Sequence, residues 1–206
     1  MSLNPEAAIK SEFIERYENE VNAIWDQVVR LNTNLYLLEK IRAFPFDEEV
    51  AIEPTFWEYT YQALFDSSIL LSWKLVSDKT GGFTITQFKN LISTTYIKHE
   101  KKAEFKDLIK KIDFSKKLKT EKKKVEVLRQ KQVAHLDLNS RDQVEAVRLE
   151  VAELKKLADS ITELFTNLSF SEKACLPIGY HLKVLLQGQD PEKTDIDKIL
   201  DFMRSL

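Results

Sequence analysis

Apolar residues recur with alternating spacings of three and four along two long stretches of the chain. The first series is Val21, Ile24, Val28, Leu31, Leu35 and Leu38, and the second is Val144, Val147, Val151, Leu154, Ala158, Ile161, Phe165 and Leu168. Because this spacing places side chains on one face of an α-helix, each series predicts an amphipathic helix whose apolar face lies in the core. The polar run Asn32-Thr33-Asn34 is a candidate break in the first helix.

Proline residues predict the ends of the first helices. Asn4-Pro5-Glu6 combines a capping residue with a proline at the first helical position, and the first long helix should end before Pro45. Pro54 opens a second helix that we expect to reach about Asp78, and its apolar side chains point nearly all round. Such a helix is either buried centrally or shared between the core and a partner chain.

Turn and capping residues divide the remainder of the chain into further helices. The expected boundaries are a turn at residues 78–82, a cap at Thr84 or Thr86, a junction near Asp113-Phe114-Ser115, a capping box at Ser140-Arg141-Asp142-Gln143 and a cap at Thr194. We expect the last helix to turn Ile199, Leu200 and Met203 inward.

The scarcity of turn-forming residues decides the fold class. Four glycines and five prolines occur in 206 residues, and none lies between Phe83 and Leu176. Because the turns between strands mostly require glycine, proline, asparagine or aspartate, the sequence predicts an all-α protein. A chain of this length can bury a sizeable core, so we expect one helical domain over residues 1–206.

Composition also bears on the compartment. No apolar run approaches the roughly 20 residues that cross a bilayer, and the N-terminus lacks the residue order of a signal peptide. The single cysteine, Cys175, excludes an internal disulfide framework. We therefore expect a cytoplasmic protein without a membrane partner.

Charge is unevenly distributed along the chain. Residues 97–131 hold 14 lysines and arginines against 6 acidic residues, whereas the remainder holds 17 against 27. A segment of net charge +8 beside a remainder of −10 favours a basic surface that meets an anionic partner, most commonly nucleic acid. The alternative is a lysine-rich helix face that is simply solvated.

Metal and cysteine chemistry have little support. His99, His135 and His181 are far apart in sequence, and no paired-cysteine, HExxH or EF-hand spacing occurs. Cys175 and His181 could act as nucleophile and base, but a lone cysteine before a proline loop is more often a small apolar residue.

One apolar series stops where candidate chemistry begins. Leu118, Val125 and Leu128 follow helical spacing, and the next positions on that face are Gln132 and His135, with Arg129 alongside. On an ideal helix Arg129 and His135 lie roughly 120° apart around the axis and about 9 Å apart along it. They therefore do not converge within one undistorted chain, but a two-fold dimer could gather two copies of each in one cleft. A histidine satisfied within its own helix is the alternative interpretation of His135.

The segment Arg129-Gln-Lys-Gln-Val-Ala-His135-Leu-Asp137 resembles the Arg-x(4–6)-His motif of the HEPN superfamily. Its Val-Ala-His-Leu-Asp ending is most similar to the branch related to the abortive-infection protein AbiU2. The apolar stretch from Phe56 to Asp78 and the stretch Thr84-Ile85-Thr86-Gln87-Phe88 also resemble that branch. The resemblance covers roughly residues 10–170 and implies a HEPN-like up-and-down helical bundle, with residues 171–206 as a C-terminal extension that adds a helix.

What the resemblance implies is a metal-independent endoribonuclease that acts as a homodimer without a cofactor, often in phage defence or beside an antitoxin protein. Arg129 would bind the phosphate, His135 would transfer protons and Gln130 would be the polar residue after the arginine. Gln130 departs from the Asn, Asp or His usual in active members, which puts its positioning in doubt. Substrate RNA would contact Gln132 and Lys131, and the lysines of the basic segment would hold its backbone: Lys116, Lys117, Lys119, Lys122, Lys123 and Lys124.

Three hypotheses remain open from the sequence. The first is the ribonuclease. The second is a non-catalytic helical module that binds RNA or a protein partner. The third is a structural bundle in which the lysines are merely solvated.

Overall fold

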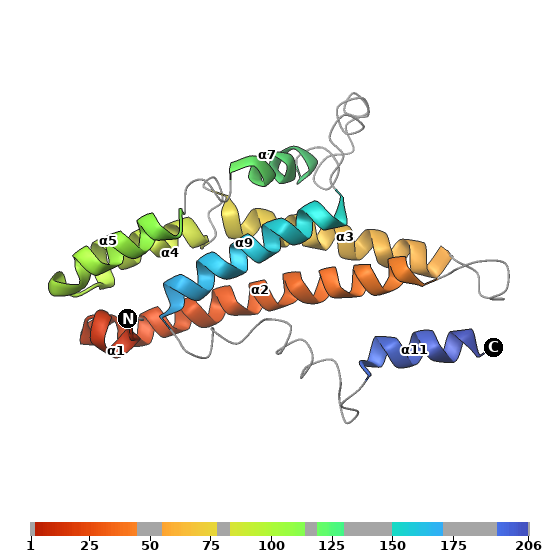
Figure 1. Ribbon diagram of the computed structural model, residues 1–206, viewed down its shortest axis with the longest axis horizontal. Coiled ribbons are helices and arrows are strands. Elements are labelled where there is room, and N and C mark those ends of the chain that lie inside the picture. Colours follow the sequence, from red (N-terminus) through yellow and green to blue (C-terminus); the bar gives the residue numbers. More distant parts are fainter. Residues whose placement is uncertain are drawn as a thin grey trace.

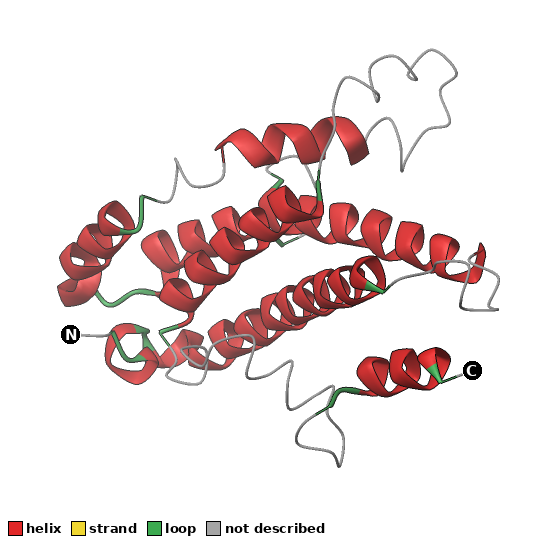
Figure 2. Ribbon diagram, turned by 45° about the vertical axis from the view of Figure 1, so that its right-hand side comes forward, coloured by secondary structure: helices red, strands yellow, loops and turns green. Residues whose placement is uncertain are grey.

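The structure, a computed structural model, describes residues 3–44, 55–77, 83–113, 119–129, 150–170 and 193–205. Three long helices form its centre: α2 (Ile14–Ala43), α3 (Thr55–Val76) and α9 (Val151–Ser169). Figure 1 shows α3 and α9 lying along α2, with α7 packed against α3 and α9 and α11 beside one end of α2. The described residues form helices and connecting turns, which confirms the predicted all-α helical bundle (Figure 2).

The N-terminal segment begins as predicted but does not continue directly into the long helix. Asn4 Oδ1 accepts a hydrogen bond from Glu6 N at 2.9 Å and caps the single turn of α1 (Pro5–Ala8). The backbone is then extended at Ile9, which pairs in antiparallel fashion with Ile97. A 3-10 turn, η1 (Ser11–Phe13), leads into α2.

Helix α2 is unbroken through the asparagine run that was a candidate break. Asn32 Nδ2 donates to the carbonyl oxygen of Val28 at 2.8 Å and to Thr162 Oγ1 on α9 at 3.3 Å. Asn34 Nδ2 donates to Ser67 Oγ on α3 at 3.0 Å. These polar side chains therefore tie the three long helices together, and α2 ends at Ala43, before Pro45 as predicted.

Helix α3 is buried over only part of its length. Its buried residues begin at Ser68, whereas Phe56 is 67% exposed and Tyr59 is 75% exposed. The expectation of a centrally buried helix is therefore correct for the C-terminal half and wrong for the first turns. The alternative, in which a partner chain shares this helix, stays a prediction.

Shorter helices form the segment between α3 and α9. Thr84 and Gln87 exchange side-chain to backbone hydrogen bonds, so the predicted cap of α4 (Ile85–Leu91) is confirmed at Thr84. The π-helical turn η2 (Ile92–Tyr96) and the 3-10 turn η3 (His99–Lys101) lead to α5 (Lys102–Lys111), which is followed by α7 (Lys119–Leu128). A helix therefore lies on each side of the junction expected near Asp113, while the turn at residues 78–82 lies outside the described residues.

Helix α9 begins later than its apolar series suggested. Glu150 has an extended backbone and forms a reciprocal capping box with Glu153, so the helix starts at Val151. The expectation of one uninterrupted helix from Val144 is wrong at this point, and the capping box expected at Ser140 lies outside the described residues. The remaining members of the series, from Val151 to Leu168, are all buried as predicted.

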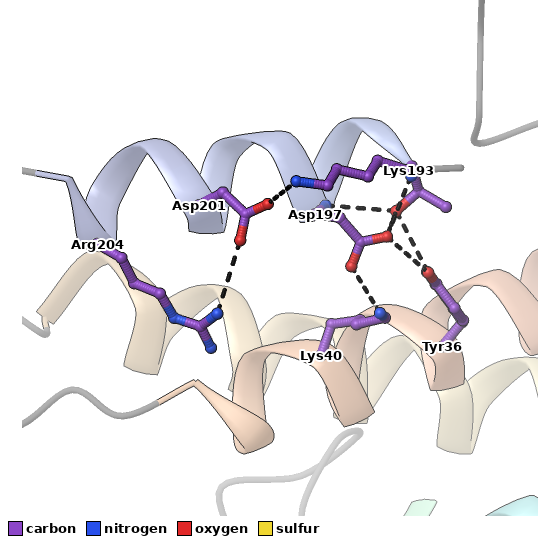
Figure 3. A network of polar contacts seen from close by, with 7 residues as sticks. Tyr36, Lys40, Lys193, Asp197, Asp201 and Arg204 are labelled. Atoms are coloured by element: carbon purple, nitrogen blue, oxygen red, sulfur yellow. Dashed lines mark hydrogen bonds and ion pairs between the residues drawn. The ribbon is translucent and has the colours of Figure 1, made fainter. Parts of the chain in front are cut away.

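The C-terminal helix α11 (Asp195–Arg204) docks against α2. Thr194 caps it as predicted, and Leu200 and Met203 pack with Phe44 in a small separate cluster. The inward orientation expected for Ile199 is wrong, since this side chain is 49% exposed. Figure 3 shows Asp197 reaching Lys40 and Tyr36 on α2, with 2.6 Å between Asp197 Oδ1 and Lys40 Nζ.

The length and apolar character of the helices bear on whether any of them could cross a membrane. Within the described residues, no helix combines the length and the low charge that crossing a membrane requires.

Candidate nucleic-acid site around Arg129

Arg129 follows directly after α7, whose apolar side holds it against the bundle. Val125 is fully buried and Leu128 is 3% exposed, so the short apolar series that precedes Arg129 does face the core. The guanidinium carbon of Arg129 lies 5.8 Å from the ring centre of Trp73 on α3. At that distance the ring face attracts the cation, which fixes the partly buried side chain beside α3.

Arg129 lies at a surface depression of about 540 Å³ that four parts of the chain build. The lining residues are Gln27 and Arg30 from α2, Leu70, Leu71, Trp73 and Lys74 from α3, Phe83 before α4, and Arg129. Three of these side chains are cationic, and none of the described residues lining the depression is acidic. The local potential therefore favours an anion.

Two of the residues that line the depression each have a buried polar atom without a hydrogen-bond partner. Arg129 Nε and Gln27 Oε1 are buried and make no hydrogen bond, and they are two of four such side-chain atoms in the described part of the chain. A buried polar atom left without a hydrogen bond costs about 1–3 kcal/mol, so such atoms require an explanation. An unpartnered donor and an unpartnered acceptor at one depression are complementary to a ligand that carries both kinds of group.

The other predicted site residues are described only in part. Lys123 on α7 is exposed and Lys122 is half-buried. The backbone of Lys124 lies in α7, but its side chain lies outside the described residues, as do Gln130, Lys131, Gln132 and His135. The structure thus brings Arg129 together with α2 and α3, while its relation to His135 and to a second chain stays a prediction.

A second basic depression lies between α4 and α5. It has a volume of about 390 Å³, and Lys89, Lys102 and Lys106 are on its walls. Unlike the depression at Arg129, it contains none of the unpartnered buried atoms found in the described residues. Its lysines add to the positive charge of the basic segment, but none of its described lining residues has a buried polar atom that a ligand would satisfy.

Sequence reasoning missed three polar residues of the Arg129 depression. Gln27 and Arg30 flank the apolar series of α2, and Lys74 follows the buried Trp73. In the sequence these positions look like the ordinary polar side of an amphipathic helix. Only the packing of α7 against α3 distinguishes them from other surface residues, and no local spacing carries that information.

Potential metal ligands do not gather in the described part of the chain. There, no group of three or more His, Cys, Asp or Glu side chains is arranged to hold a metal ion. His99 is exposed on η3, while Cys175 and His181 lie outside the described residues.

Comparison with known proteins identifies the family. No curated protein and no solved structure matches the chain. The sequence model of one family, described as AbiU2, matches residues 14–170, a region that spans α2, α3 and α9 and includes the whole Arg129–His135 segment. Since this match covers well over half of the 206 residues, the chain belongs to the HEPN family of AbiU2 proteins.

Proposed function

We propose that this protein is a metal-independent endoribonuclease in which Arg129 and His135 of two chains form the active site of a homodimer. Family membership supports the proposal, as does the basic segment that ends at Arg129. The observation that carries it is the environment of Arg129. Its guanidinium lies at a depression with two further cationic side chains, and its Nε is buried without a hydrogen-bond partner.

The chemistry suits these residue types. RNA contains its own nucleophile, the 2′-hydroxyl group, which attacks the adjacent phosphate and displaces the 5′-oxygen. An imidazole titrates near neutral pH, so one His135 can take the proton from the 2′-oxygen while a second protonates the leaving oxygen. Arg129 opposes the charge that builds on the phosphate. The products are a 2′,3′-cyclic phosphate and a 5′-hydroxyl end.

Gln130 and the nearby polar residues have supporting roles in this proposal. Gln130 supplies a polar amide next to Arg129, and Gln132 and Lys131 contact the substrate. Lys122, Lys123 and Lys124 neutralise the RNA backbone without reading its sequence.

Cleavage of structured RNA in EDTA is the direct test. The unmodified protein should produce fragments with cyclic phosphate ends, and His135→Ala should abolish them. His99→Ala is the matched control, because His99 is exposed on η3 and is not among the residues that line the depression at Arg129. Equal cleavage by the unmodified protein and His135→Ala, or no cleavage of a broad RNA panel, refutes the ribonuclease.

The proposed active site also predicts the oligomeric state of the protein. Because one undistorted helix does not bring Arg129 to His135, the proposal requires two chains. Light scattering at micromolar concentration should therefore give the mass of a dimer. A monomer under these conditions contradicts the paired active site.

A non-catalytic RNA-binding module is the second candidate function. The lysines on α5 and α7 and the depression at Arg129 favour it independently of His135. It predicts RNA affinity that falls steeply with salt and is unaccompanied by cleavage.

The biological setting follows from the family. We propose a role in phage defence or as the toxin partner of an antitoxin protein, in the cytoplasm. We also propose that residues 171–206 belong to the same domain as the matched region, since α11 packs on α2. Co-expression with neighbouring genes, followed by measurement of cell growth, tests the toxin assignment.

A further inference from the structure

We infer that the depression beside Arg129 is a binding pocket for one nucleotide unit of RNA, in which Gln27 recognises the ribose 2′-hydroxyl and Arg30 binds phosphate. This inference rests on the proposed function, because it takes RNA as the ligand of the Arg129 site. It adds two residues of α2, about a hundred positions before the motif, to the surface that selects the substrate.

Both unpartnered atoms are buried in the wall of the depression, so a ligand reaches them when their side chains turn toward it, and the chemistry of each atom defines what the ligand must offer. Arg129 Nε is a donor and requires an acceptor, which a phosphate oxygen supplies. Gln27 Oε1 is an acceptor and requires a donor. A phosphate cannot supply that donor, whereas in RNA every internal phosphate lies beside a ribose hydroxyl. DNA has the phosphate without the hydroxyl, so only RNA satisfies both atoms through its backbone.

Charge and shape at the depression agree with a nucleotide. Arg30 lies one helical turn beyond Gln27 on the same side of α2, and Lys74 faces the depression from α3. Together with Arg129 they provide three positive charges, and none of the described lining residues opposes them. The volume of about 540 Å³ falls within the roughly 300–1,000 Å³ of small-molecule pockets, so it is large enough for a nucleotide unit.

Aromatic side chains complete the lining. Trp73 is only 5% exposed and lies beneath the Arg129 guanidinium, so it supports the arginine and offers little surface to a base. Phe83 also lines the depression and is half-buried, with its ring edge-to-face against Phe88 at 5.8 Å between ring centres, so a base would stack on the part of the ring that stays exposed. Stacking on a phenyl ring is tolerant of base identity, so the pocket distinguishes RNA from DNA without reading sequence.

All of the described lining residues come from one chain. Gln27, Arg30 and Lys74 therefore belong to the same chain as the Arg129 beside them, whatever a second chain adds at the active site. Their contribution to binding can be tested separately from cleavage.

The test measures affinity in protein that cannot cleave. Fluorescence anisotropy in EDTA compares an RNA oligomer with DNA of the same sequence, using His135→Ala as the parent. Adding Gln27→Met removes the acceptor at nearly constant length and should lower RNA affinity about two- to tenfold, the effect of one net hydrogen bond, while DNA affinity is unchanged. Gln27→Glu keeps an acceptor but adds negative charge, so it should weaken both nucleic acids and retain the preference for RNA.

Arg30 is tested through the salt dependence of the same binding. Arg30→Ala should weaken RNA and DNA alike and reduce the slope of log affinity against log salt by about 0.7, the value for one single-strand phosphate contact. Arg42→Ala on the exposed far end of α2 is the matched control for charge, and Asn22→Leu is the control for Gln27→Met. Circular dichroism and thermal melting confirm that each variant is folded.

The outcomes separate this inference from the ribonuclease. Loss of RNA preference in Gln27→Met supports the pocket, even if the unmodified protein cleaves nothing. Equal effects of Gln27→Met on RNA and DNA, an effect of Arg30→Ala no larger than that of Arg42→Ala, or no measurable binding to either nucleic acid each overturn the pocket, even if cleavage is found.

Discussion

Helix α11 should open away from α2 more often when Asp197 loses its charge. Asp197 Oδ1 accepts a hydrogen bond from Lys40 Nζ at 2.6 Å, and Asp197 Oδ2 accepts one from Thr194 Oγ1 at 2.6 Å. Burial alone would raise the pKa of the Asp197 carboxyl, but the hydrogen bonds from Lys40 and Thr194 outweigh burial and lower the pKa from 3.8 to about 2. Acidification or Asp197→Asn removes this charge.

The pKa sets both the direction and the size of the effect. A carboxyl with a depressed pKa in the folded state stabilises that state above its unfolded pKa, and the contribution is lost as the pH falls through the folded value. For Asp197 that window runs from about pH 4 down to about pH 2. The gap corresponds to about 2.4 kcal/mol at 1.36 kcal/mol per pH unit. The Asp197 side chain is 24% exposed and that of Lys40 is 35% exposed, so screening reduces the expected loss to about 1 kcal/mol.

Amide hydrogen exchange measures this loss within α11 itself. The helix is attached through a small cluster of Phe44, Leu200 and Met203, so it can open while the main core stays folded. A loss of about 1 kcal/mol raises the open fraction roughly fivefold. Asp197→Asn should therefore speed exchange of the α11 amides about fivefold at pH 7 and leave the amides of α9 unchanged.

Asp201→Asn provides the matched control. Asp201 is on the same helix, but its ion pairs are to Lys193 at 2.7 Å and Arg204 at 3.6 Å, within the same segment. Faster exchange in both variants, or in neither, refutes the role of the Lys40–Asp197 pair. Acid treatment gives a second comparison, since unmodified protein should approach Asp197→Asn as the pH falls toward 2.

Three further predictions concern the core and its caps, and each is measured by denaturant unfolding. Tyr17→Phe removes the hydrogen bond that the hydroxyl donates to the Leu168 carbonyl oxygen at 2.9 Å and should cost about 1 kcal/mol; no loss contradicts a buried bond. Thr84→Ala removes the capping box of α4 and should cost about 1 kcal/mol, whereas Thr84→Ser should restore most of it. Phe165→Ala removes a fully buried ring stacked 6.0 Å from Trp25 and should cost about 3–5 kcal/mol; a loss below 1 kcal/mol places that ring outside the core.

The helical seams were predictable from sequence because burial acts on every turn. Ile24, Val28, Leu31 and Leu38 are each no more than 1% exposed, as their spacing on α2 requires. The asparagine run was harder to interpret. Asparagine is neutral or unfavourable in an isolated helix. Here the side chains of Asn32 and Asn34 donate hydrogen bonds to Thr162 and Ser67 on neighbouring helices, and sequence spacing does not reveal such partners.

Caps were predictable where both hydrogen-bonding partners are close in sequence. Thr84 and Thr194 each pair with a residue three positions later, so the four-residue pattern contains the whole interaction. Glu150 was missed because its capping box falls inside a faultless apolar series. Ile199 was assigned inward because α11 was expected to bury a wider face than its small cluster with α2 covers.

The candidate site also has a part that the sequence predicts and a part that it does not. The motif singled out Arg129, and the structure gives it a cationic depression, whereas the part assigned to His135 stays a prediction. Gln27 and Arg30 could not be predicted from the sequence. They line the depression only because α7, about a hundred residues further along the chain, packs against α3 and places Arg129 there. A sequence motif can identify the residues that carry the chemistry. The residues that face them from other helices can be identified only once the packing of the bundle is known.

The pairing of Ile9 with Ile97 ties the first turn of the chain to the start of its basic segment. Lys10 N donates to the Tyr96 carbonyl oxygen and Lys98 N to that of Ala8, both at 2.9 Å, while Ala8 and Ile9 are at most 1% exposed. The region matched by the family begins later, at residue 14. The start of the matched region therefore does not coincide with the start of the folded structure. A fragment cut at residue 14 would remove Leu3, Ala8 and Ile9 from the core and leave the segment before α5 without its backbone partners, so the N-terminal turn is needed to hold the start of the basic segment in place.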